Sequence, residues 1–234
     1  MTSKTAQRLL IVSNRLPLRV VKEREGTWRL ERGSGGLVTA LAPVLRNRGG
    51  AWIGWPGVPA EKSSGNLSEL MDKAGKDLGY RIVPVALSRR EQRLFYEGFS
   101  NEVIWPLFHE FPSLAQFKPS YWDAYRSVNR KYAEIIASHS QSDHFIWIHD
   151  YQLMLVAQSL RDLGVQSHLA FFLHIPFPPL DVFLKLPWRL EVLRALLQYD
   201  LLGVQTARDR RNVIECFRAL MPDVTWRGRG RVVV

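Results

Sequence analysis

FFLHIPFPPLD, at residues 171–181, is the stretch that decides the fold, together with HFIWIHDY at residues 144–151. In each, an apolar, aromatic-rich run of about strand length stops at a histidine, and in the first a proline-rich turn follows at once. Open α/β sheets place their ligand crevice in the loops beyond the carboxyl ends of parallel strands. We therefore expect a binding site in the loops that follow these two runs.

The rest of the sequence alternates between strand-like and helical patterns. Strand-like runs occupy residues 8–13, 51–57, 80–87, 144–149, 168–174 and 200–205, and a weak hairpin pattern covers 18–31. Helical patterns occupy residues 37–45, 88–99, 120–139, 151–163, 186–197 and 207–220. Strands that alternate with helices predict a Rossmann-like α/β fold, with a mostly parallel, doubly wound sheet flanked by helices.

The helical patterns also carry local signals. Ser88 with Glu91, and Ser120 with Asp123, match the capping box that begins many helices. Leu94, Phe95, Phe99 and Val103 predict the buried stripe of the first of these helices. Pro43 should kink or shorten the helix at residues 37–45, and Pro84 places its strand at a sheet edge.

The composition is that of a globular domain. The 234 residues are 46% hydrophobic and 23% charged, and no apolar run approaches the roughly 18 residues that span a bilayer. The first residues show no signal-peptide pattern, so we expect a cytoplasmic protein without a membrane partner. Cys216 is the single cysteine and lies in a helical pattern, which predicts a small core residue.

The net charge of +10 favours anionic partners. Nucleic acid and phosphorylated metabolites are the two candidate classes. The basic residues are scattered, and no helix-turn-helix, zinc-finger or RNP-like signature accompanies them. We therefore expect a small phosphorylated ligand rather than nucleic acid.

A glycine-rich turn, GSGG at residues 33–36, joins the hairpin pattern to the first helical pattern. Such a turn offers backbone N–H groups and the positive end of a helix to an anion. Its spacing matches neither a P-loop nor a complete dinucleotide fingerprint. The other interpretation is a plain turn in which only glycine tolerates a positive φ.

Asp150 follows the strand-like run at residues 144–149, and His174 ends the run at residues 168–174. Asp150 could accept hydrogen bonds from sugar hydroxyls or bind a metal, and it could equally cap the helix that follows; the two roles are compatible. His174 fits a buried core histidine on spacing alone. The rigid proline-rich turn after it favours a functional role.

The sequence lacks the residues that several kinds of site require. There is no H-E-x-x-H motif and no cysteine pair, and His149 and Asp150 cannot point the same way from a strand, so we expect no metal. There is no G-x-S-x-G elbow. Two catalytic carboxylates cannot be chosen, because only Asp150 and Asp181 fall at the expected crevice. Trp55, Tyr96 and Trp105 could pack on sugar faces or nucleobases.

Eight collinear motifs resemble the amino-terminal half of the trehalose-6-phosphate synthase family, which has the two-domain GT-B architecture. They are SNRLP at 13–17, SGGLV at 34–38, WIGWPG at 52–57, YEGFSNEVIWPLFH at 96–109, WDAYRSVN at 122–129, WIHDYQL at 147–153, FFLHIPFP at 171–178 and DLLGVQT at 200–206. The resemblance implies a retaining hexosyltransferase. It would transfer glucose from a nucleotide sugar, usually UDP-glucose, to glucose 6-phosphate, without a metal or further cofactor.

The resemblance also implies roles for the matching residues. On the acceptor side, Arg15 and Tyr96 would bind the phosphate, and Trp55 and Trp105 would close the pocket. Asp150 would contact the acceptor sugar near the reacting hydroxyl. On the donor side, Gly36 would approach the phosphates and His174 would contact the transferred glucose. Asp150 and His174 are thus the expected catalytic residues. An arginine fork matches phosphate oxygens well.

The family's second Rossmann-like domain, which holds most of the nucleotide, has no counterpart in these residues. We expect residues 1–234 to form the acceptor-binding domain and to be inactive alone. A glucosylglycerol-phosphate synthase, a cyclitol pseudo-glycosyltransferase and a non-catalytic sugar-phosphate-binding module remain alternatives. Association into a homo-oligomer stays open.

Overall fold

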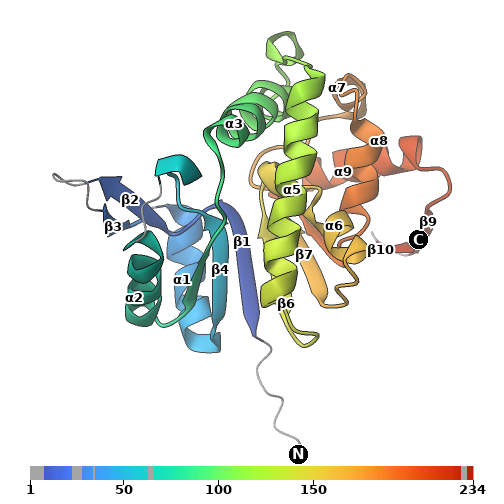
Figure 1. Ribbon diagram of the computed structural model, residues 1–234. Helices are drawn as coiled ribbons and strands as arrows, with labels where there is room; N and C mark the ends of the chain where they lie inside the picture. The colour runs from blue at the N-terminus through green and yellow to red at the C-terminus, as the bar shows by residue number, and fades with distance from the viewer. Residues whose placement is uncertain (1–7, 23–27, 34, 63–65, 228–230, 234) are drawn as a thin grey trace, which may run out of the picture.

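A six-stranded parallel sheet runs through the centre of the computed structural model, which describes residues 8–22, 28–33, 35–62, 66–227 and 231–233 (Figure 1). Its strands, in spatial order, are β5 (Arg81–Pro84), β4 (Gly50–Trp55), β1 (Leu9–Arg15), β6 (Phe145–His149), β7 (His168–Phe172) and β8 (Leu201–Gly203). Every neighbouring pair is parallel. The chain moves outward from β1 in both directions, so the order reverses between β1 and β6, where doubly wound sheets bind their ligands.

Helices cover both faces of this sheet. The α-helices are α1 (Gly36–Arg48), α2 (Asn66–Leu78), α3 (Arg89–Glu91), α4 (Trp105–Phe108), α5 (Pro119–His139), α6 (Val156–Asp162), α7 (Leu180–Phe183), α8 (Arg189–Leu196) and α9 (Ala207–Leu220). Shorter or irregular helices are η2 (Ala60–Lys62), η3 (Gln92–Ile104), η4 (Pro112–Leu114) and η5 (Tyr151–Leu153). Two antiparallel pairs lie outside the sheet: β2 (Leu18–Lys22) with β3 (Trp28–Arg32), and β9 (Thr225–Arg227) with β10 (Arg231–Val233).

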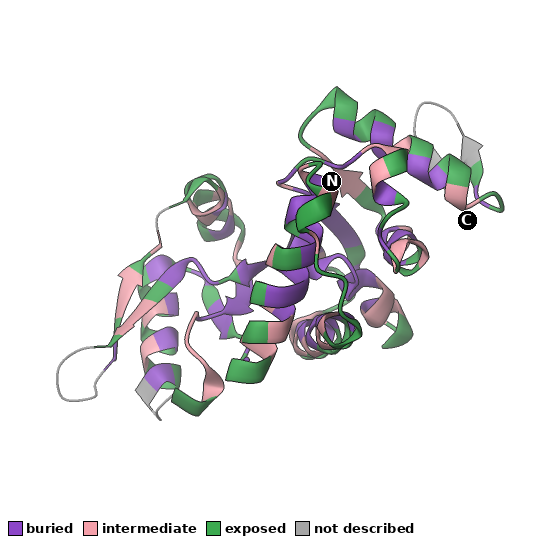
Figure 2. Cartoon of the chain, turned by 90° about the horizontal axis from the view of Figure 1, so that it is seen from above, coloured by how far each residue is buried: buried purple, intermediate pink, exposed green. Residues whose placement is uncertain are grey.

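The two faces carry separate cores, and the strands alternate between them. Leu10 and Val12 of β1 pack into the core under α5, whereas Leu9 and Ile11 pack with α1 and α2. In β4, Trp52 likewise turns away from its neighbour Ile53. Buried positions accordingly cluster along the sheet and on the inner sides of the helices (Figure 2). Burial on both faces explains why these strands are almost continuously apolar, and the predicted fold class is confirmed.

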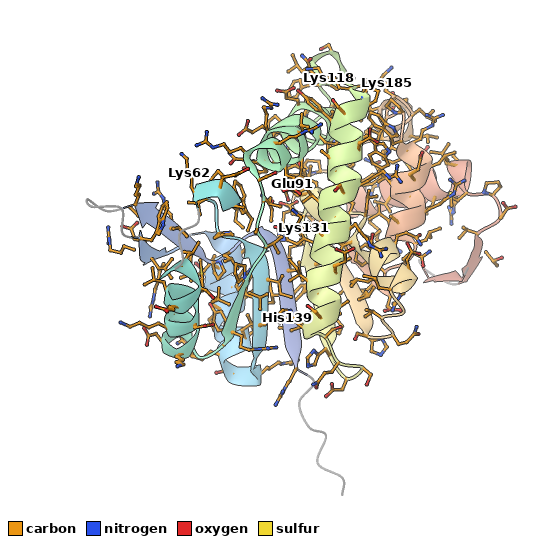
Figure 3. The ribbon with its side chains drawn as sticks, in the orientation of Figure 1. Lys62, Glu91, Lys118, Lys131, His139 and Lys185 are labelled. Atoms are coloured by element: carbon orange, nitrogen blue, oxygen red, sulfur yellow. The ribbon has the colours of Figure 1, made fainter. Side chains whose placement is uncertain are left out.

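The segment before α4 departs from the predicted helix. The capping box at its start is present, with the Glu91 N–H donating to Ser88 Oγ at 3.2 Å and the Ser88 N–H donating to Glu91 Oε2 at 2.8 Å. Lys131 of α5 lies beside Glu91 and pairs with it (Figure 3). From residue 92 to residue 104 the helix η3 has the wider π geometry, in which backbone hydrogen bonds join residues five apart. Phe95, Phe99 and Val103 are buried, but Leu94 is only half-buried, and its predicted place in the stripe is wrong.

Three other local predictions need correction. The helix α5 begins at Pro119 after Lys118, without a side-chain cap, so the capping box expected at Ser120 is absent. Proline at the first helical position needs no N–H partner. Pro43 lies inside α1, and the helix continues past it to Arg48. The helix expected at residues 151–163 is divided into η5 and α6.

Buried side chains of α5 explain that division. The Asn129 amide donates to the carbonyl oxygens of Tyr125 and Gln152, and its Oδ1 accepts from the Leu155 N–H at 3.0 Å. The Tyr125 hydroxyl donates to the Tyr151 carbonyl at 2.6 Å and accepts from the Met154 N–H at 3.2 Å. Backbone groups that would continue one helix are thus bound by α5, which fixes the loop after β6.

Two smaller predictions hold. Cys216 is a free, fully buried residue of α9, and β5, with Pro84, is an edge strand. Among the described residues, no helix combines the length and apolar character needed to cross a membrane.

Asn129→Ala should lower the free energy of unfolding by about 2–4 kcal/mol, because the buried Leu155 N–H loses its acceptor. Urea denaturation measures this loss. Arg130→Ala, one residue further along α5, is the control, since within the described part of the chain Arg130 makes only an exposed ion pair with Glu134; its effect should stay within about 0.5 kcal/mol. Equal losses for the two variants would contradict the network's role.

Candidate functional site

Four of the predicted site residues lie at one edge of the sheet. Arg15 ends β1, Trp55 ends β4, Asp150 follows β6 directly, and His174 comes two residues after β7. These strands are adjacent and parallel, so their carboxyl ends open on the same side, at the point where the strand order reverses. The expectation that these residues meet at one edge of the sheet is confirmed, and the ligand crevice at this edge stays a prediction.

Asp150 links the loops after β6 and β7. Its Oδ1 accepts from the Tyr151 N–H at 3.0 Å and from the His174 N–H at 3.1 Å, while its own N–H donates to the Phe172 carbonyl at 2.8 Å. It caps η5, so the capping interpretation holds. Its backbone, at φ 77° and ψ 164°, lies in a region that residues other than glycine rarely adopt. Such strain, about 1–3 kcal/mol, persists only where surrounding contacts enforce it.

His174 is held from several sides. Besides the bond from its N–H to Asp150, its Nε2 lies 3.1 Å from Nδ1 of His149, and its carbonyl accepts from the Gln205 side chain. Its ring lies 4.7 Å from the Phe172 ring, centroid to centroid. These contacts fix the orientation of His174, which is half-buried and so is not a core histidine. Its functional role stays a prediction.

Burial sets the protonation of this group. It raises the pKa of Asp150, an effect that hydrogen bonds from two backbone N–H groups and the nearby His174 partly offset. Burial lowers the pKa of His174, and the Asp150 charge opposes this. Burial, with a smaller contribution from His174, lowers the pKa of His149 to about 3. The site thus combines one carboxyl group with two imidazoles that favour the neutral form, a set suited to hydrogen bonding with hydroxyl groups.

A second cluster joins Arg15, Trp55 and Tyr96. The Arg15 guanidinium lies over the Trp55 ring, 4.5 Å from its centroid, and the Trp55 and Tyr96 rings meet edge to face at 6.1 Å. Gly57 lies so close that a Cβ there would collide with the guanidinium. The Trp55 indole N–H donates to the Val58 carbonyl at 2.9 Å, which fixes the ring. Arg15 is the exposed end of this cluster, so its charge stays available to an anion.

The remaining two predicted residues lie apart from that cluster. Trp105 is 43% exposed and stacks on His109, with 4.1 Å between ring centroids; within the described residues it has no ring contact with Trp55 or Tyr96.

Gly36 begins α1, and a Cβ on Gly35 or Gly36 would meet nothing within 4 Å. Gly35 is extended at φ 178°, and neither glycine adopts the left-handed region, so the alternative of a turn that needs glycine for that reason does not apply to them. Ser34 lies outside the described residues.

A hollow lies at the opposite, amino-terminal edge of the sheet. It has a volume of about 1000 Å³, and Arg8, Lys76, Arg81, His139 and His144 are among its lining residues. His139 ends α5 there (Figure 3). The C-terminal cap residues of α1 and α5, Gly49 and Ser140, also line the hollow. Basic side chains at helix carboxyl ends complement the helix dipoles. We therefore give them a structural role and keep the candidate site at the opposite edge.

The Glycosyltransferase family 20 model matches residues 7–233 of this chain. The chain belongs to glycosyltransferase family 20. It is 42% identical over 219 residues to the trehalose-6-phosphate synthase of Mycolicibacterium vanbaalenii, and 39% identical over 219 residues to that of Mycobacterium tuberculosis H37Rv. Each alignment covers 94% of this chain but 44% of the relative, so the chain spans less than half the length of these curated relatives.

Solved structures of the family agree. An apo structure of OtsA superposes with a TM-score of 0.79 at 33% identity, over 97% of this chain and 46% of that one. The Burkholderia xenovorans alpha,alpha-trehalose-phosphate synthase in complex with glucose-6-phosphate gives 0.76 at 32% identity, covering 96% of this chain and 46% of the other. A trehalose-6-phosphate structure from E. coli bound with UDP-2-fluoro glucose gives 0.77 at 35%, with 94% and 44% covered. The fold is therefore one half of a GT-B architecture.

Two residues of the candidate site, His149 and Gln205, are not among those predicted from the sequence. Strand alternation turns His149 away from Asp150, and its contact with His174 joins residues 25 apart. Gln205 follows the last strand of the sheet, and that position was the available signal. No group of three or more potential metal ligands occurs in the described part of the chain.

The chain should lose stability as the pH falls from 7 to 5. The unfolded state protonates His149 below its ordinary pKa of 6.5, whereas the folded state resists until about pH 3. The unfolded state therefore binds more protons across this window, and the contribution of His149 falls by about 2 kcal/mol between pH 7 and pH 5. Urea denaturation at several pH values measures the slope.

His149→Asn should flatten that slope by about the same 2 kcal/mol, since the titrating group is gone. His168→Asn is the control, because the His168 side chain is 71% exposed, and its slope should equal that of the unmodified chain. An unchanged slope in His149→Asn would show that other groups cause the acid sensitivity.

Proposed function

We propose that residues 1–234 form the amino-terminal, acceptor-binding domain of a trehalose-6-phosphate synthase. The reaction is transfer of glucose from a nucleotide sugar such as UDP-glucose to glucose 6-phosphate, with retention at the donor carbon. The observation that carries this proposal is the grouping of Arg15, Trp55 and Tyr96 at the same sheet edge as Asp150 and His174. Identity of 42% to a trehalose-6-phosphate synthase supports it.

Arg15 and Tyr96 are assigned to the phosphate of the acceptor. A guanidinium fork pairs with two phosphate oxygens at once, and a phenol hydroxyl adds one further donor. Trp55 holds the Arg15 guanidinium over its ring and touches Tyr96, so it can orient both groups. Trp105, with its exposed indole, is assigned to the closure of the acceptor pocket over the sugar.

Asp150 and His174 are assigned to the reacting sugars. Asp150 accepts hydrogen bonds from the acceptor near its reacting hydroxyl, and His174 contacts the transferred glucose. No side chain is assigned as a nucleophile. In a same-face mechanism, the bond from the donor carbon to the leaving phosphate oxygen breaks, the acceptor oxygen bonds to that carbon from the same face, and its proton passes to the leaving phosphate. This step needs no metal.

Gly36 is assigned to the donor diphosphate, which its backbone can approach because the space beside it is open. The nucleotide and most of the diphosphate would be held by a second domain. The relatives support this division, because each is more than twice as long as the part that this chain matches.

Calorimetric titration should detect glucose 6-phosphate binding to this chain, and Arg15→Ala should weaken it by about 10- to 100-fold, because a charge-assisted contact is lost. Arg194→Ala, an exposed arginine of α8, removes the same charge and should leave the affinity unchanged. Glucose 6-phosphate affinity that survives Arg15→Ala would sink the phosphate assignment. Tighter binding of glycerol 3-phosphate would instead favour a glucosylglycerol-phosphate synthase.

The isolated chain should form no trehalose 6-phosphate from UDP-glucose and glucose 6-phosphate. Groups that stabilise the charge on the leaving diphosphate are assigned to the second domain, and loss of even one such donor costs about 10²–10³ in kcat. Product detection by chromatography checks this, with the full-length Mycolicibacterium vanbaalenii relative as the positive control. Appreciable product from residues 1–234 alone would refute the division of labour.

A further inference from the structure

His149 lies directly behind His174, where no role is assigned to it by the proposed function. It is the last residue of β6 and only 1% exposed. Its Nδ1 is 3.1 Å from Nε2 of His174, and its other face lies against Trp147, 4.7 Å away between ring centroids. A buried imidazole thus supports the imidazole that faces the crevice.

Only one of the two facing nitrogens, His149 Nδ1 or His174 Nε2, carries the proton that lies between the rings. The surroundings of His149 decide which of them does. Nε2 of His149 is buried and has no hydrogen-bond partner among the described residues. If His174 donated, His149 would carry its own proton on that buried Nε2, leaving an unpaired N–H. An unpaired buried N–H is rarer and costlier than an unpaired acceptor. His149 therefore carries its proton on Nδ1 and donates it to His174.

We propose that His149 is a positioning residue that holds His174 in the Nδ1-protonated, neutral form. His174 then offers its Nδ1–H as a donor to a ligand oxygen, and Nδ1 makes no hydrogen bond with any other described residue. The nature of that oxygen, a hydroxyl of the transferred glucose, rests on the proposed function. The tautomer itself does not depend on it.

The rest of the environment fixes where this donor points. The main chain of His174 is tied at both ends, by its N–H to Asp150 and by its carbonyl to Gln205, and Phe172 packs on its ring. A fixed main chain leaves ring rotation and tautomer as the remaining freedoms, and the His149 bond restricts both. Partners behind a histidine set its tautomer in this way at many sites.

The test is long-range ¹H–¹⁵N correlation of the histidine side chains in the ligand-free full chain at neutral pH. We expect both His149 and His174 to show a protonated Nδ1 and a bare Nε2. His149→Leu removes the donor at similar volume, and the Nδ1–H population of His174 relative to Nε2–H should fall by about fivefold, the effect of one ordinary hydrogen bond. His168→Asn, at an exposed histidine, should leave the His174 spectrum unchanged.

His149→Asn covers the case in which His149→Leu fails to fold. Its side-chain amide can donate from near the position of Nδ1, so the Nδ1–H form of His174 should again predominate. A protonated Nε2 on His174 in the unmodified chain would overturn the proposal, as would a His174 tautomer ratio that His149→Leu leaves unchanged. Because this spectrum is recorded without ligand, a failed titration with glucose 6-phosphate would count against the proposed function alone.

Discussion

The hydrogen bond from the His174 N–H to Asp150 Oδ1 joins the two loops on which the site depends. It connects the ends of β6 and β7, and it helps to hold Asp150 at a positive φ that the residue would not adopt in isolation. In that conformation, the carboxyl group accepts from the backbone N–H groups of both Tyr151 and His174. The strained backbone of Asp150 thus goes together with the two hydrogen bonds that join the loops after β6 and β7.

The surrounding core enforces this strain from the other side of the loop. Tyr125 and Asn129 of α5 bind the backbone of residues 151–155, so the chain cannot relax into the regular helix that its sequence pattern favours. The Tyr151 hydroxyl adds a bond to Asn101 of η3 at 3.0 Å. Asp150 is therefore trapped between a strand that ends before it and a loop whose backbone partners are fixed by another helix.

Sequence patterns predicted the sheet and the strand ends that carry the candidate residues well, because both depend on local signals. Apolar runs ending in polar residues locate β1, β6 and β7, and the helix expected at residues 207–220 is α9. Patterns failed where distant side chains decide the outcome. The division of the helix after Asp150 depends on Asn129, and the role of His149 depends on a contact across two strands.

The contacts of the proline-rich turn after His174 explain its rigidity. Pro176, Pro178 and Pro179 lack N–H groups, so the turn has few donors that need partners. The Phe177 N–H between them donates to Asp209 Oδ1 at 3.1 Å, and the Phe177 carbonyl accepts from Asn212 at 2.8 Å.

Asp209 also completes the capping box of α9 through Thr206, the residue after Gln205. One buried carboxyl group therefore ties the turn after His174 to the loop that holds the His174 carbonyl. The stretch is rigid because prolines reduce the donors in its backbone, while α9 binds both the N–H and the carbonyl of Phe177. The main chain of His174 is thereby held in place by contacts within the protein alone.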